Sequence, residues 1–119
     1  MHAVALSLCL LLPGTEPAPD NLEGVYLVRG EMTGSAVIRR TEGSTYLVQW
    51  CLSKGTPEGI VHSATVDVGL RVGDSFSVAW PRRDGVGVTV YRINGRVLAG
   101  QSSAGGTEEL HRLSRLPEE

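Results

Sequence analysis

The sequence predicts an all-β protein: an antiparallel, up-and-down meander of about eight strands that forms a closed or partly open small barrel. Short apolar runs rich in Val, Tyr, Trp, Ile and Thr follow one another, and several alternate with polar residues at the period of a strand. The 15 glycines lie between these runs, where they favour tight turns. A chain of 119 residues has room for one domain, which we expect over residues 24–113.

Nine apolar runs mark the expected strands, with the two runs on either side of Asp67 read separately. They are Val25–Arg29, Ser35–Arg39, Thr45–Leu52, Gly59–Val66, Val68–Val72, Ser75–Trp80, Val86–Ile93, Arg96–Gln101 and Thr107–Leu113. Asn94-Gly95 predicts a type I′ hairpin turn, in which both central residues have positive φ. Pro81 is expected to end the strand before it, because proline cannot donate a backbone hydrogen bond to the sheet.

The end of the predicted domain has two interpretations. The run Thr107–Leu113 continues the series as a last short strand. Leu110, Leu113 and Leu116 are three residues apart, which is also the spacing of one or two turns of helix over Glu108–Leu116. A short C-terminal helical turn is therefore the alternative, and residues 114–119 are expected to form a disordered tail.

One pattern occurs twice at a period of 30 residues: Gly-x-(Ser/Thr)-aromatic-x-Val-x-Trp, in Gly43–Trp50 and again in Gly73–Trp80. The aromatic residue, the valine and the tryptophan of each copy are two residues apart, so all three project from the same face of a strand. Each copy therefore delivers a bulky row of side chains to one side, which we expect to be the barrel interior.

The aromatic side chains of this repeat are the candidate ligand-binding residues: Tyr46, Trp50, Phe76 and Trp80. An eight-stranded barrel either fills its interior with side chains or holds one small ligand there. Aromatic residues make up only 5% of the chain, so core packing is the interpretation that we favour for these four. The alternative is that they line a pocket for a small apolar or ring-shaped ligand.

Residues 1–18 are expected to be a secretory signal peptide or its remnant, followed by a linker over residues 19–23. The apolar run Ala3–Leu12 has the length of a signal core and is shorter than the roughly 20 residues that a membrane helix needs. The mature protein is then exported, to the periplasm or the cell exterior. A buried N-terminal strand or helix is the alternative. Cys9, after Leu6-Ser7-Leu8, resembles a lipoprotein attachment cysteine and makes lipid anchoring a minor hypothesis.

The residues carry no catalytic, metal-binding or cofactor-binding motif. No serine lies in a Gly-x-Ser-x-Gly turn, and His62 and His111 are isolated from other metal-ligating residue types. Cys51, in an apolar strand, is expected to be a small buried residue. The 11 basic and 13 acidic residues are mixed along the chain, with a net charge of −2, so no basic face for nucleic acid is expected. We therefore expect no enzyme, metal or cofactor, and neither a nucleic-acid partner nor a membrane span.

Turn glycines and strand aromatics recur in six segments: Gly24–Gly30, Gly34–Ile38, Gly43–Trp50, Ser77–Trp80, Gly85–Tyr91 and Gly105–Leu110. Together these segments resemble small exported bacterial proteins of the planctomycete type that are often labelled fibronectin-binding proteins. The resemblance implies a β-rich fold, and its label implies an adhesion role. More loosely, the meander resembles the avidin-type and lipocalin-type barrels, the calycins, which bind small ligands in the barrel mouth.

Two hypotheses about function follow. The first is an exported, non-enzymatic β-barrel domain that binds a surface partner or forms part of the envelope. The alternative is a calycin-like carrier that binds a small apolar ligand in a Trp-lined pocket. An enzyme is the third and least favoured reading.

Overall fold

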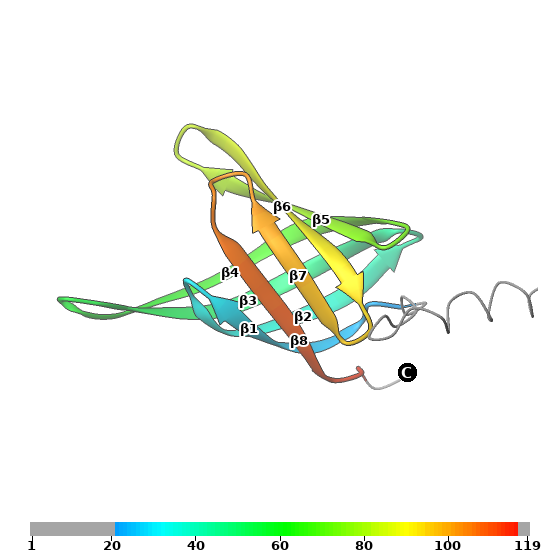
Figure 1. Cartoon of the computed structure of the whole chain (residues 1–119), viewed down its shortest axis with the longest axis horizontal. Coiled ribbons are helices and arrows are strands. Elements are labelled where there is room, and N and C mark those ends of the chain that lie inside the picture. Colours follow the sequence, from blue (N-terminus) through cyan, green and yellow to red (C-terminus); the bar gives the residue numbers. More distant parts are fainter. Residues whose placement is uncertain (1–20, 117–119) are drawn as a thin grey trace, which may run out of the picture.

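A computed structural model of the chain describes residues 21–116, and within them eight strands form a closed barrel (Figure 1). The strands are β1 (Gly24–Gly30), β2 (Thr33–Glu42), β3 (Thr45–Thr56), β4 (Gly59–Val72), β5 (Ser75–Arg82), β6 (Gly85–Asn94), β7 (Val97–Ser102) and β8 (Thr107–Ser114). Each strand pairs antiparallel with the next, and β8 pairs with β1 to close the barrel. The predicted up-and-down meander is confirmed, and its closed form is the correct one.

The C-terminal helical turn is a wrong prediction, because residues 107–114 form the strand β8. Leu110 and Arg112 are buried while Glu109 and Leu113 are exposed, which is the alternation of a strand. The strand pairs with β1 on one side and β7 on the other, and this closure of the barrel overrides the three-residue spacing of the leucines. The expected signal peptide, Cys9 and part of the tail lie outside the described residues.

Two expected strand ends are also wrong. The runs 59–66 and 68–72 form one strand, β4, because Asp67 takes an extended backbone conformation between them. The strand β5 continues through Pro81 to Arg82. Pairing of β5 with β4 ends at Ala79, so Pro81 lies where β5 pairs only with β6, and an edge position of this kind tolerates proline.

The hairpin turn after β6 differs from the predicted type I′. Its two central residues are Gly95 and Arg96, and φ is 60° at Gly95, whereas no described residue other than glycine has a positive φ. A positive φ at the first central residue alone is the mark of a type II′ turn. Gly43 and Gly73 open equivalent turns with φ of 58° and 62°.

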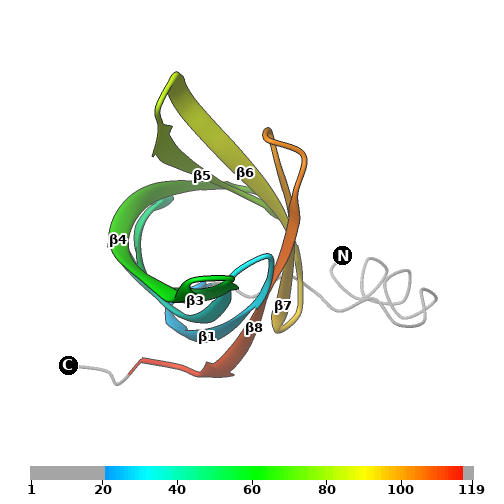
Figure 2. The ribbon, with the colours of Figure 1, turned by 90° about the vertical axis from the view of Figure 1, so that its left-hand side faces the viewer.

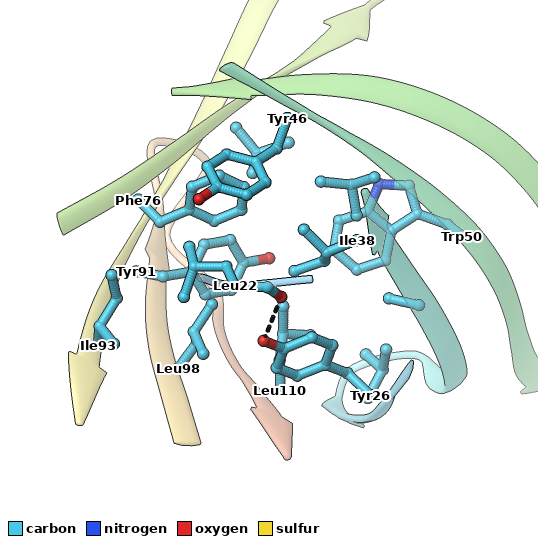
Figure 3. Packing of buried hydrophobic residues seen from close by; sticks show 14 residues of the cluster. Leu22, Tyr26, Ile38, Tyr46, Trp50, Phe76, Tyr91, Ile93, Leu98 and Leu110 are labelled. Carbon is cyan, nitrogen blue, oxygen red and sulfur yellow. Dashed lines mark hydrogen bonds between the residues drawn. The ribbon is translucent and has the colours of Figure 1, made fainter. Parts of the chain in front are cut away.

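The duplicated pattern lies on β3 and β5, and both of its rows face the barrel interior, as predicted. Phe76 is fully buried in the core, where its ring packs edge-on against Tyr46 at 5.5 Å and tilted against Tyr91 at 6.3 Å between ring centroids (Figure 3). The other buried apolar residues are Leu22, Tyr26, Val28, Ala36, Ile38, Val48, Trp50, Val78, Ile93, Leu98 and Leu110.

Glycines on neighbouring strands make room for three of the large interior rings. A Cβ atom built on Gly69 would lie 2.4 Å from Phe76 Cζ, one on Gly87 would lie 2.4 Å from Trp80, and one on Gly100 would lie 2.5 Å from Tyr91. Each of these rings therefore covers the bare backbone of an adjacent strand. The sequence predicted glycines in turns, and the packing of large rings against strand glycines is a second use of this residue type.

We expect Gly69→Ala to destabilise the protein by about 1–3 kcal/mol, because the new methyl group must displace the Phe76 ring in a well-packed core. Denaturant unfolding followed by circular dichroism measures the change in unfolding free energy. Gly55→Ala on β3 is the control, since a Cβ there meets nothing within 4 Å. Equal stability of both variants and the parent protein would show that the ring does not depend on the glycine.

One end of the barrel is closed by the residues before β1. Leu22, assigned to a linker from the sequence, is fully buried, and its carbonyl oxygen accepts a hydrogen bond of 2.7 Å from the Tyr26 hydroxyl (Figure 3). Arg112 Nη2 donates to the carbonyl oxygens of Asn21 at 2.7 Å and Glu23 at 3.2 Å. These contacts hold the segment before β1 across this end of the barrel.

Candidate functional site

A pocket of about 360 Å³ lies in the barrel at the end opposite Leu22, which we call the open end. The connections β1–β2, β3–β4, β5–β6 and β7–β8 all lie at this end. Glu31 and Met32 from the first of them, and Ala104 and Gly106 from the last, border the pocket mouth. The pocket wall is formed by inward-facing side chains of the barrel strands.

The barrel wall is split beside this pocket. The strand β4 pairs with β5 only over Val68–Val72, so residues 59–67 of β4 pair with β3 alone. The hairpin of β5 and β6 diverges from β4 above this point (Figure 2). Thr65 and Asp67 line the pocket from one side of the split, and Trp80 lines it from the other. The pocket is therefore bordered by the turns at its mouth and by the split in the wall.

Both tryptophans of the repeat line the pocket, and each has its polar edge satisfied within the protein. Trp50 Nε1 donates to Asp67 Oδ2 at 2.9 Å, and Trp80 Nε1 donates to Thr89 Oγ1 at 3.0 Å. These bonds hold the rings in place and leave apolar ring surface for the pocket. Trp50 is 6% exposed and belongs to both core and pocket, whereas Trp80 is half-buried.

A second polar pair lies deeper in the wall. The Tyr91 hydroxyl donates a short hydrogen bond to Glu108 Oε2. Glu108 pairs with Gly30 on one side and Gly100 on the other, and these neighbours have no side chains to fill the space around it. Burial and the nearby Glu108 carboxylate raise the pKa of Tyr91, so the phenol keeps the proton that it donates.

Two carboxyl groups thus lie in the pocket wall, Asp67 and Glu108. Burial raises the pKa of Glu108, and the hydrogen bond from Tyr91 opposes that rise. Burial also raises the pKa of Asp67, opposed by the hydrogen bond from Trp50. Both carboxylates are incompletely solvated and would gain from a positively charged or hydrogen-bond-donating ligand.

The four residues singled out from the sequence fall into two groups. Trp50 and Trp80 line the pocket, whereas Tyr46 and Phe76 pack against each other in the core and are not among its lining residues. Eight further polar or aromatic residues of the lining were not singled out from the sequence: Glu31, Thr65, Asp67, Thr89, Tyr91, Ser102, Thr107 and Glu108. Strand alternation would have identified several of these, because Glu108 has the parity of the buried Leu110, and Thr89 and Tyr91 have that of the buried Ile93.

Cys51 is exposed, which corrects the expectation of a buried cysteine. It follows the inward-facing Trp50 on β3, so alternation turns it outward. Ser53 Oγ lies 2.9 Å from His62 Nδ1 on the exposed part of the β3–β4 hairpin, outside the pocket, and no carboxylate of residues 21–116 contacts this histidine. Within residues 21–116, no three His, Cys, Asp or Glu side chains are grouped to hold a metal ion.

Comparison with known proteins gives no match to a family model, a curated protein or a solved structure. Among the described residues, no helix has the length and apolar character needed to cross a membrane. The case for function consequently depends on the pocket.

Proposed function

We propose that this protein is a non-enzymatic carrier that binds a small organic ligand in the pocket at the open end of the barrel. The observation that carries the proposal is the pair of indole rings, Trp50 and Trp80, whose N–H groups are bonded within the protein while both rings line one cavity. A cavity of about 360 Å³ is within the range of small-molecule sites, which are mostly apolar with a few placed polar groups. Export through the signal expected at residues 1–18 is part of the proposal.

A neutral fluorescent probe, N-phenyl-1-naphthylamine, tests the carrier function. We expect it to bind with a rise in its own emission and quenching of the tryptophan emission. Thr65→Phe, which places a ring at the pocket wall, is expected to weaken binding at least about tenfold, or about 1.4 kcal/mol.

The matched control is Val66→Phe, because Val66 is the next residue of β4, is 56% exposed and projects from the opposite face of the strand. Probe binding should be unchanged in this variant. No response to the probe, or equal binding by both variants, would refute a ligand site in this pocket.

A second candidate function, docking onto a protein surface, is supported by the outer face of β4. Val66, Val68, Leu70 and Val72 alternate along the strand and are each at least half exposed on this face. Contiguous exposed apolar surface is typical of interaction sites. The double variant Val68→Ser/Leu70→Ser separates the two functions: probe binding persists if the pocket is the functional site, whereas a partner that requires this face is lost.

A further inference from the structure

We propose that the ligand of this pocket is an organic cation, an amine carried on an apolar body with the size of one or two rings. The inference rests on the proposed function and specifies its ligand class. It follows from three features of the pocket: carboxylate oxygens without a partner among the described residues, no basic group among the described lining residues, and aromatic side chains beside them.

Asp67 and Glu108 each use one carboxylate oxygen, and within residues 21–116 the other oxygen has no partner. Asp67 Oδ2 accepts from Trp50, and Glu108 Oε2 accepts from Tyr91, while no hydrogen bond from the described residues reaches Oδ1 or Oε1. Neither free oxygen is a sealed, buried atom, since Arg112 Nε is the single such atom without a partner in the described part of the chain. Both residues line the pocket, so these oxygens are accessible to a ligand.

All the charged side chains among the described lining residues are acidic. Its titratable residues are Glu31 from the β1–β2 turn, Asp67 from β4, Tyr91 from β6 and Glu108 from β8, and no Lys, Arg or His is among the described lining residues. Arg82 lies close by, with Cζ 5.8 Å from the centre of the Trp80 ring, but its Nε pairs with Asp84 Oδ1 at 3.2 Å. An anionic ligand would meet repulsion here, and a neutral one would leave the carboxylates unpaired.

An ammonium group satisfies this site in two ways. It donates hydrogen bonds to the free carboxylate oxygens, and charge-assisted bonds of this kind are the stronger class. Trp50, Trp80 and Tyr91 line the pocket beside these carboxylates, and an aromatic ring attracts cations through its quadrupole, most strongly where water is excluded. The apolar part of the ligand would then pack against the indoles, with Val78 and Leu52 beside them.

Three probes of similar shape test the inference by titration calorimetry on the full chain: 2-naphthylmethylamine, 2-naphthylmethanol and 2-naphthoate. At neutral pH we expect the amine to bind at least about tenfold more tightly than the alcohol, and the carboxylate to bind most weakly. Equal binding of amine and alcohol overturns the cation inference while the carrier function stands. Failure of all three probes, and of N-phenyl-1-naphthylamine, overturns both.

Isosteric variants assign the preference to the carboxylates. Glu108→Gln and Asp67→Asn should each lower the amine-to-alcohol preference by about tenfold while the alcohol binds as before. The control is Glu109→Gln, because Glu109 is the next residue of β8, is exposed and pairs with His111 at 2.9 Å on the outside of the barrel. Two independent variants keep the test decisive if one fails to fold, and an unchanged preference in either folded variant contradicts its assigned role.

The preference should also depend on pH in a defined direction. Protonation removes the negative charge of Asp67 and Glu108, so binding of the amine should weaken as the pH falls through their pKa values. Because burial raises both pKa values, this loss should begin at a higher pH than for exposed carboxyls, with binding of the alcohol unaffected. A preference for the amine that is constant from neutral pH to below the usual carboxyl range would contradict the role of these groups.

Discussion

A Phe76→Ala variant is expected to lose about 3–5 kcal/mol of unfolding free energy, the largest effect that we predict for a single side chain. Phe76 is fully buried, and its ring packs against the rings of both Tyr46 and Tyr91. Truncation removes its buried apolar surface and leaves a cavity, which rigid neighbouring strands can fill only in part. Equilibrium unfolding in guanidinium chloride, followed by circular dichroism, measures the loss.

The control for this variant is Val72→Ala on the adjoining strand β4, where the side chain is 69% exposed. We expect a change within about 0.5 kcal/mol there. Since domains of this size have a total stability of about 5–15 kcal/mol, Phe76→Ala should shift the midpoint strongly and could leave the domain largely unfolded at 37 °C. A loss below about 1 kcal/mol would refute the central role of this ring.

Local patterns in the sequence were sufficient to predict most of the strands and, for the two copies of the repeat, the face that each presents. Alternation assigned Tyr46, Val48 and Trp50 to one side of β3 because adjacent residues of a strand point to opposite faces, whatever the rest of the fold does. The same rule, applied to Cys51, would have placed it outside. The prediction of a buried Cys51 was wrong because the apolar residues around it were given more weight than the alternation of inward-facing and outward-facing positions.

Other features depend on pairing between distant parts of the chain and have no local signal. The strand β8 pairs with β1, from which it is separated by most of the described chain. Only this long-range pairing shows that residues 107–114 form a strand and not a helix. The pocket requires β4 and β5 to part at the Val68–Ala79 pair, so that residues 59–67 of β4 lie on one side of the split and Trp80 on the other. Parity predicts an inward-facing residue but does not predict its depth, so it could not separate Phe76 in the core from Trp80 in the pocket.

The closed end of the barrel provides the second large expected effect. An Arg112→Ala variant should lose about 2–4 kcal/mol of unfolding free energy. Arg112 is 8% exposed, donates to the carbonyl oxygens of Asn21 and Glu23, and has its guanidinium 5.5 Å from the centre of the Tyr26 ring. The alanine variant has no donor for either carbonyl group and no cation–π contact with Tyr26. It also leaves empty the space that the arginine side chain fills.

Arg112→Met separates the hydrogen bonds of this residue from its packing, because methionine keeps an apolar stem but has no donor. We expect it to recover part of the loss, with the remainder due to the unpaired carbonyl groups of the segment before β1. Arg92→Ala is the surface control, since Arg92 is exposed on β6, and it should change stability by no more than about 0.5 kcal/mol. Hydrogen exchange gives a local readout: the amide of Tyr26 in β1 should lose protection in Arg112→Ala beyond the global loss, because that end of the barrel is then open to water. If Arg112→Met is as stable as the parent protein, the bonds to Asn21 and Glu23 do not hold this end closed, and packing of Leu22 alone does so.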